Sequence, residues 1–171
     1  MANEPWLEAD QTEGAQARRA DLLKGLRQVQ YWIDEALAQV PDETALWWEP
    51  AAGVPSIGAR LQHILGASRR LAAYALAADP DPESLAAAAR SDWTPQMLPK
   101  ASLVQEVRDF FAELIHRLEA LPEEAMDELR PLGRKRLPVR RWTILHHLVE
   151  HAAHHSGQLI LLVRLYTHHV G

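Results

Sequence analysis

Residues 143–166 read TILHHLVEHAAHHSGQLILLVRLY, and this stretch decides the fold. Its apolar residues recur every three or four positions, which places them on one face of a helix with about 3.6 residues per turn. They span about 100° of the circumference, as expected of a helix that packs against a core on one side. The pattern predicts a helix over residues 139–166 whose core face carries Leu145, Leu148, Ala152, Leu159, Leu162 and Val163.

Three segments nearer the N-terminus show the same helical periodicity. Ser56 is placed to cap the start of the second of them, and Ser102 followed by Gln105 predicts a capping box at the start of the third. Proline residues end all three, because proline cannot continue a helix. The predicted helices cover residues 16–40, 56–78 and 102–121.

The connections between these helices are long. Residues 83–90 predict a short extra helix between the second and third long helices, and residues 131–138 predict a basic loop before the fourth. No alternating pattern of a strand is found. We therefore expect an all-α four-helix bundle over residues 16–167, preceded by a polar extension over residues 1–15.

Composition excludes several classes of protein. The chain has 171 residues and no cysteine, which rules out disulfides, zinc ribbons, iron–sulfur clusters and cysteine nucleophiles. The formal net charge of -5 argues against partners such as nucleic acid or an anionic membrane. No apolar stretch of the sequence, residues 159–163 included, approaches the roughly 20 residues of a membrane span, and the acidic N-terminus is not a secretory signal. We expect a cytoplasmic protein.

Histidine is the unusual component, since five of the nine histidines fall within ten residues. On a helical wheel His151 and His155 flank the core face, His147 and His154 lie further out, and His146 lies on the polar side. Two imidazoles four residues apart can bind one metal ion, as they do in helical zinc proteases. The protease motif itself is absent, because alanine follows His151 where that motif requires glutamate.

A third ligand must come from another helix, and the pattern alone leaves His63 and His116 as candidates. His116 lies near the end of the third long helix. His63 lies about 130° from the centre of the apolar stripe of the second, which is a boundary position. Such a position suits a ligand at the mouth of a cleft and equally suits an exposed histidine.

Three stretches, in this order, resemble the DinB/YfiT-like superfamily of metal-binding four-helix bundles. The last of them is similar to a family pattern close to H-x-x-x-H-x-G-Q, although serine stands at position 156 where many members have arginine. The stretches are WWEPAAGVPSIG (47–58), HILGA (63–67) and HLVEHAAHHSGQ (147–158). The resemblance covers residues 17–166. It implies a divalent ion, nickel, zinc or iron, bound by His63, His151 and His155, and it implies a homodimer.

The resemblance also implies a class of activity. Some relatives are thiol-dependent S-transferases or isomerases, and others are hydrolase-like. Three neutral imidazoles leave coordination positions open, and an open divalent ion lowers the pKa of a bound water toward about 7 or deprotonates a bound thiol. The catalytic group would thus be that water or the thiolate of a small cofactor, since the chain has no cysteine. The alternative is a stress-response bundle that binds a metal without catalysis, and a third hypothesis is that the histidines are incidental.

Two further groups of residues complete these expectations. Gln158 shares the histidine stripe and is our preferred partner for orienting a ligand imidazole, with His147 and His154 as further candidates. Arg134, Lys135, Arg136, Arg140 and Arg141 form a basic run before the last helix. The run is interpreted either as a solvated loop or as a site that captures an anionic substrate.

Overall fold

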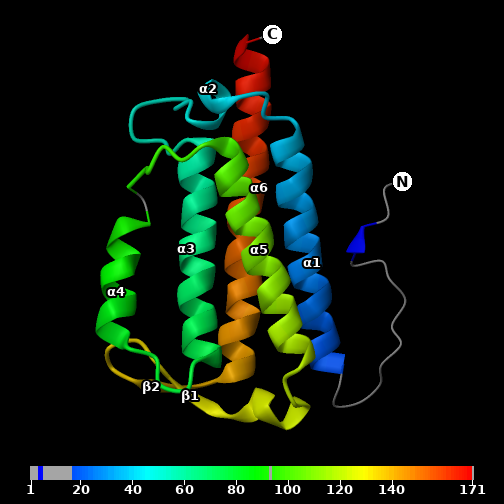
Figure 1. The fold of residues 1–171 in the computed structure, drawn as a ribbon, viewed down its shortest axis with the longest axis vertical. Coiled ribbons are helices and arrows are strands. Elements are labelled where there is room, and N and C mark those ends of the chain that lie inside the picture. Colours follow the sequence, from blue (N-terminus) through cyan, green and yellow to red (C-terminus); the bar gives the residue numbers. More distant parts are fainter. Residues whose placement is uncertain (1–3, 6–16, 93, 171) are drawn as a thin grey trace.

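The computed structural model describes residues 4–5, 17–92 and 94–170 (Figure 1). Four long helices lie side by side in this part of the chain: α1 (Ala17–Ala38), α3 (Ile57–Leu76), α5 (Lys100–Glu119) and α6 (Arg141–Val170). Shorter elements connect them: α2 (Glu43–Leu46), α4 (Pro82–Ser91), the 3-10 helix η3 (Glu123–Asp127), and the strands β1 (Leu129–Leu132) and β2 (Leu137–Arg140). The expected all-α bundle is confirmed.

The bundle forms because each long helix buries one apolar stripe. Helix α6 packs against α3 and α1, while α5 packs against the same two helices from the other side. Phe111, Leu26, Ile64 and Leu148 are among the fully buried side chains at the centre. Helix α4 lies outside the four, next to α3 (Figure 1). One side of α3 and α6 therefore faces the core. On the other side, α4 and the connecting segments are the neighbours of α3.

The two predicted helix caps have different outcomes. Ser56 caps α3 as expected, since its side chain accepts a hydrogen bond from the amide of Ala59 at 3.2 Å. The capping box at Ser102 is wrong, because α5 begins at Lys100. The amide of Lys100 instead donates to the Glu43 carboxylate at 3.0 Å. A side chain on α2 thus supplies the cap, and no local pattern in the sequence can show that.

The prediction of a loop over residues 131–138 is wrong, because β1 and β2 pair there as an antiparallel hairpin. Leu129 is opposite Arg140 and Leu132 is opposite Leu137. Gly133, with a φ of 67°, takes the left-handed conformation that the tight connection requires. Strands of four residues are too short for a convincing alternation of apolar and polar residues.

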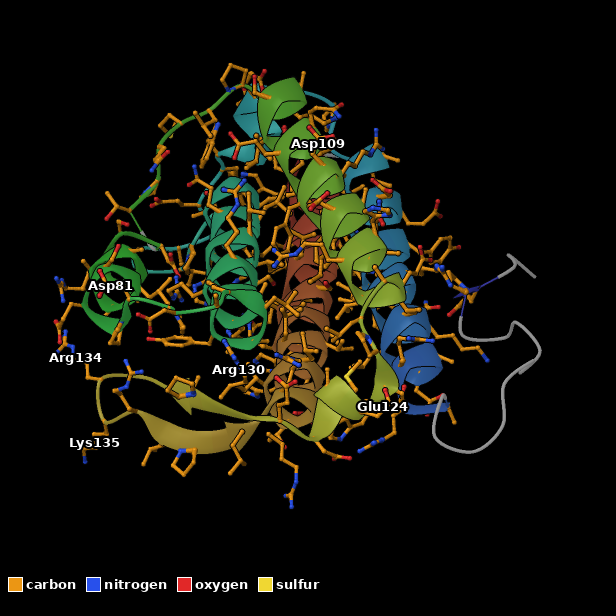
Figure 2. The ribbon with its side chains drawn as sticks, turned by 60° about the horizontal axis from the view of Figure 1, so that its bottom comes forward. Asp81, Asp109, Glu124, Arg130, Arg134 and Lys135 are labelled. Atoms are coloured by element: carbon orange, nitrogen blue, oxygen red, sulfur yellow. The ribbon has the colours of Figure 1, made fainter. Side chains whose placement is uncertain are left out.

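The basic run has structural partners in this arrangement. Arg134 and Lys135 lie at the hairpin tip, below α4 (Figure 2), and Arg134 pairs with Glu83 at 3.4 Å. Arg136 lies 3.8 Å from Asp79. Arg141 is buried and donates to the carbonyl of Ala75 at 2.8 Å, near the end of α3. These contacts connect the hairpin and the start of α6 to α3 and α4, at the end of the bundle where α6 begins.

The predicted extension over residues 1–15 lies outside the described residues except for 4–5. Within that pair, Glu4 accepts a hydrogen bond from the Gln28 side chain of α1 at 2.9 Å. No helix in the described part of the chain is both long enough and apolar enough to cross a membrane.

Candidate metal centre

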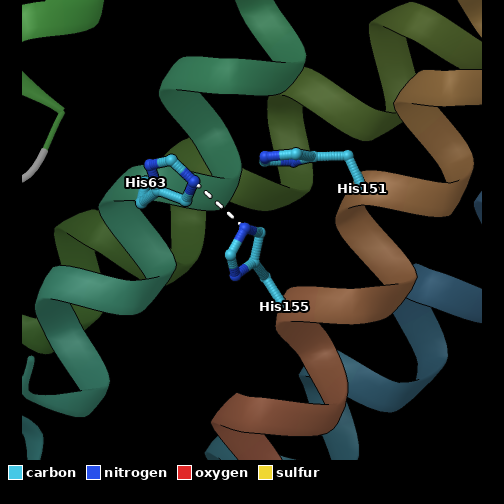
Figure 3. Close-up of side chains that lie close together, drawn as sticks. All are labelled: His63, His151 and His155. Carbon is cyan, nitrogen blue, oxygen red and sulfur yellow. Dashed lines mark hydrogen bonds between the residues drawn. The ribbon is translucent and has the colours of Figure 1, made fainter.

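Three imidazoles meet between α3 and α6 (Figure 3). His63 points from α3 toward α6, and His151 and His155 point back from successive turns of α6. One ring nitrogen from each residue can be chosen so that all three lie within 4.8 Å of one another. His63 is far from the other two histidines in the chain, and the antiparallel packing of α3 on α6 brings them together.

The spacing of these nitrogens fits a metal ion. The Nε2 atoms of His63 and His155 lie 3.2 Å apart. Two ligands at the zinc–nitrogen distance of about 2.05 Å, in a tetrahedral arrangement, are separated by about 3.3 Å. His63 is buried and the other two histidines are half-buried, so the group is partly shielded from water. The residues present therefore suit a divalent ion by donor type and by separation.

The three imidazoles are held in the form that binds metals. Burial is the main cause that lowers the pKa of His63 to about 3, and the neighbouring His155, His151, Arg60 and Arg70 contribute the rest of the decrease. Burial likewise lowers the pKa of His151 to about 4, with His155 as the next cause. The pKa of His155 is also lowered, mainly by burial. At neutral pH all three rings are uncharged, and only a neutral imidazole offers a lone pair to an ion.

Gln158 lies where the sequence predicts an orienting partner. The Nδ1 proton of His155 is donated to the Gln158 side-chain oxygen at 2.7 Å, which leaves the lone pair on Nε2. The Gln158 amide in turn donates to Nε2 of His154 at 3.1 Å. Arg60 of α3 also approaches Nδ1 of His155, at 3.2 Å, and acts there as a nearby positive charge.

Asp92 is a neighbour of the site that sequence reasoning missed. Its carboxylate lies 3.8 Å from Nδ1 of His63 and pairs with Arg70. Gly66 makes room for it, because a Cβ at that position would collide with the Asp92 carboxylate. Asp92 follows α4, and no motif or spacing relates it to His63. This segment also explains why His63, expected at a boundary, has only 8% of its surface exposed.

The other histidines do not join the group. His116 is exposed on α5, and His146 is exposed on α6. The ring centre of His147 lies 6.1 Å from that of His151, and its Nδ1 lies 3.7 Å from the Glu150 carboxylate. His154 contacts Gln158, and its ring centre lies 4.9 Å from that of His155 in an edge-to-face arrangement.

Position 156, where the sequence departs from the family pattern, faces the core. Ser156 is fully buried, and its hydroxyl donates to the carbonyl of Ala152 at 2.8 Å. Two arginine side chains of α3 lie near the histidines: Arg60 approaches His155, and Arg70 pairs with Asp92.

A pocket of about 210 Å³ lies between α3 and α6 and includes His151, one of the three histidines, in its wall. It is lined by Ala67, Arg70, Leu71, Tyr74, His147 and His151. A second cavity of about 300 Å³ lies between α3, α4 and α5, where Arg70 and Asp92 form part of its wall. His151 thus borders the first pocket and the candidate metal centre at once.

Residues 26–159 match the family model of the DinB superfamily. The structure is similar to the crystal structure of a DinB-like protein from Bacillus cereus ATCC 10987, with a TM-score of 0.60. The two sequences are 18% identical, and the likeness covers 82% of this chain and 89% of that chain. At this identity the likeness shows a shared fold. No curated protein matches the sequence.

Proposed function

Because the chain belongs to the DinB superfamily, and because three of its imidazoles converge, we propose that it is a divalent-metal-dependent enzyme that acts on a small molecule. His63, His151 and His155 are the proposed ligands. The resemblance of the sequence to this family names nickel, zinc and iron as the ions to test, and a three-imidazole donor set suits each of them.

The observation that carries this proposal is the open donor set. Within the described residues, the group that could hold an ion contains three histidines and no carboxylate. Asp92 approaches the outer nitrogen of His63, on the side away from His155, and so is placed to support a ligand rather than to be one. Structural zinc sites are closed by four protein ligands, whereas catalytic sites keep a position for water or substrate.

The protein's own residues would perform three tasks. The histidines hold the ion, Gln158 fixes the tautomer of His155, and Asp92 with Arg70 packs behind His63. A bound divalent ion would supply Lewis acidity that makes a water or a thiol nucleophilic at neutral pH. We assign the activity to S-transfer or hydrolysis, and in the first case a small-molecule thiol supplies the sulfur because the chain has no cysteine.

The test is an assay of protein purified without a histidine tag and loaded with Ni²⁺, Zn²⁺ or Fe²⁺. Cysteine and glutathione are offered with monobromobimane, where a carbon–sulfur bond forms and bromide leaves, and p-nitrophenyl acetate reports hydrolysis. We expect a rate above the uncatalysed background, lost on chelation and in His155→Ala. His146→Ala, an exposed histidine on the same helix, should keep the rate.

A different outcome would replace this proposal. A protein that binds one ion and melts at a lower temperature after chelation, yet turns over none of these probes, is a non-catalytic metal-binding bundle. A protein whose rate is unchanged in His155→Ala does not use this site.

A further inference from the structure

The pocket in the α3–α6 groove has a definite chemical character. Ala67 and Leu71 are apolar lining residues on α3, and Tyr74, which is buried, also lines the pocket. The polar part of the wall contains the guanidinium of Arg70 and the imidazoles of His147 and His151. The wall of the pocket therefore combines apolar side chains, a cation from α3 and a proposed metal ligand from α6.

Positive charge dominates around the three imidazoles. Arg60 approaches His155 from one end of the site, and Arg70 lies at the other end beside His151. The carboxylate of Asp92 pairs with Arg70, and the carboxylate of Glu150 lies further out, 3.7 Å from His147. A divalent ion on three neutral imidazoles would add two more positive charges, and such a site attracts anions.

Arg70 has binding capacity beyond its pair with Asp92. The carboxylate of Asp92 contacts Nη1 of Arg70, and this is the polar contact that the structure gives for the Arg70 side chain within the described residues. A guanidinium carries five N–H donors in a planar fork that matches a carboxylate. Arg70 also borders the pocket, so a ligand there can reach donors that Asp92 does not use.

We propose that this pocket binds a small molecule with two anionic groups, one directed to the ion and the other held by Arg70. Ala67 and Leu71 contact the short apolar segment between the two groups. The inference rests on the proposed function, because the first anionic group needs an ion on His63, His151 and His155. It adds the substrate class, a short dianion of the dicarboxylate kind, and a specificity residue, Arg70.

The test uses the full chain loaded with Co²⁺, whose visible spectrum changes when a ligand enters its coordination sphere. Succinate, glutarate and adipate are titrated against butyrate, pentanoate and hexanoate, in which a methyl group replaces one carboxylate. At least one dicarboxylate should bind about tenfold more tightly than its partner, the effect of one charge-assisted hydrogen-bonded pair.

The control variants assign that preference to a residue. Arg70→Gln should reduce the tenfold preference to about twofold or less, because the amide lacks the charge. Arg69→Gln should keep it, since Arg69 is exposed on the same helix and contacts Glu106. If Arg70→Gln disturbs Co²⁺ binding by leaving Asp92 unpaired, the double variant Arg70→Gln/Asp92→Asn removes both charges and is compared in its place.

Two results would overturn the inference without touching the metal centre. One is Co²⁺ bound by the histidines with no dicarboxylate preference in the wild-type chain. The other is a preference that persists in both Arg70 variants. Failure of Co²⁺ to bind in the wild-type chain and in Arg69→Gln would instead remove the proposed function itself.

Discussion

At the residue scale, Gln158 has the clearest role outside the three histidines. Its oxygen accepts the Nδ1 proton of His155 and leaves Nε2 free to face His63. Gln158→Leu should lower the affinity for Zn²⁺ about 10- to 100-fold, the usual cost of losing such a partner. Gln158→Glu keeps an acceptor oxygen and should recover most of the affinity. A competition titration with a zinc indicator measures both, and equal affinity in Gln158→Leu would contradict the role.

A second residue-scale prediction concerns the stability of the metal-free protein. The folded-state pKa of His63 is about 3 and that of His151 about 4, below the ordinary value of 6.5. Below pH 6.5 these two histidines bind protons in the unfolded chain but stay neutral in the folded chain. The stability that these neutral rings contribute is thus complete above pH 6.5 and is lost as the pH falls toward 3.

Urea unfolding of the chelated protein at pH 7 and pH 5 checks this sign. The free energy of unfolding should be lower at pH 5. The difference should shrink in His63→Gln, because an amide does not titrate. A protein that is equally stable at both pH values, or a difference that His63→Gln leaves intact, would be inconsistent with neutral buried imidazoles.

Some residues of the candidate site could be predicted from the sequence, and others could not. The spacing of His151 and His155 on one helix already separates them from their neighbours, because a helical wheel captures contacts within one helix. His63 could be selected over His116 only through the family resemblance, since the pattern of α3 says nothing about which helix it faces. Asp92, Arg60 and Arg70 could not be predicted, because their contacts depend on tertiary packing.

At the element scale, a close approach of α1 to α6 fixes the position in the bundle of the helix that carries two of the three proposed ligands. A Cβ added at Gly25 of α1 would lie 2.8 Å from Cγ1 of Val149 on α6. Valine is stiff at χ1 and cannot turn this methyl group away. Gly25→Ala should therefore destabilise the protein by about 1–3 kcal/mol through overpacking.

The double variant Gly25→Ala/Val149→Ala gives the matched comparison. It removes the obstructing methyl groups and should be more stable than Gly25→Ala alone in chemical denaturation. If Gly25→Ala has wild-type stability, the two helices are not in the close contact described.

Element boundaries could be predicted where the signal is local. Ser56 caps α3 through its own side chain, and the neighbouring proline supports the assignment. The start of α5 could not be predicted, because Glu43 reaches it from another element. The hairpin of β1 and β2 forms by pairing between two segments across its turn. Arg141, the residue that follows β2, donates a hydrogen bond to Ala75 near the end of α3.

At the scale of the whole molecule, an ion on α3 and α6 would add a link between two helices that are already joined by packing and by hydrogen bonds such as that from Arg141 to Ala75. Only the folded chain holds the three imidazoles together, so the ion binds the native state and stabilises it by mass action. At 100 times the dissociation constant the gain is about 2.7 kcal/mol. For a chain of this length the melting temperature should rise by about 5–10 °C.

Thermal melts of the wild-type chain with Zn²⁺ and after chelation test this linkage. His155→Ala should show no shift, and His146→Ala should shift as the wild type does. An equal shift in His155→Ala would place the stabilising ion elsewhere on the molecule.

The central claim is that His63, His151 and His155 together bind one divalent ion. Elemental analysis of untagged protein after metal loading and desalting tests it most directly, with His63→Ala and His146→Ala prepared in parallel. We expect about one ion per chain in the wild type and in His146→Ala, and almost none in His63→Ala. A wild-type chain without metal, or a His63→Ala variant that binds as much as the wild type, would contradict it.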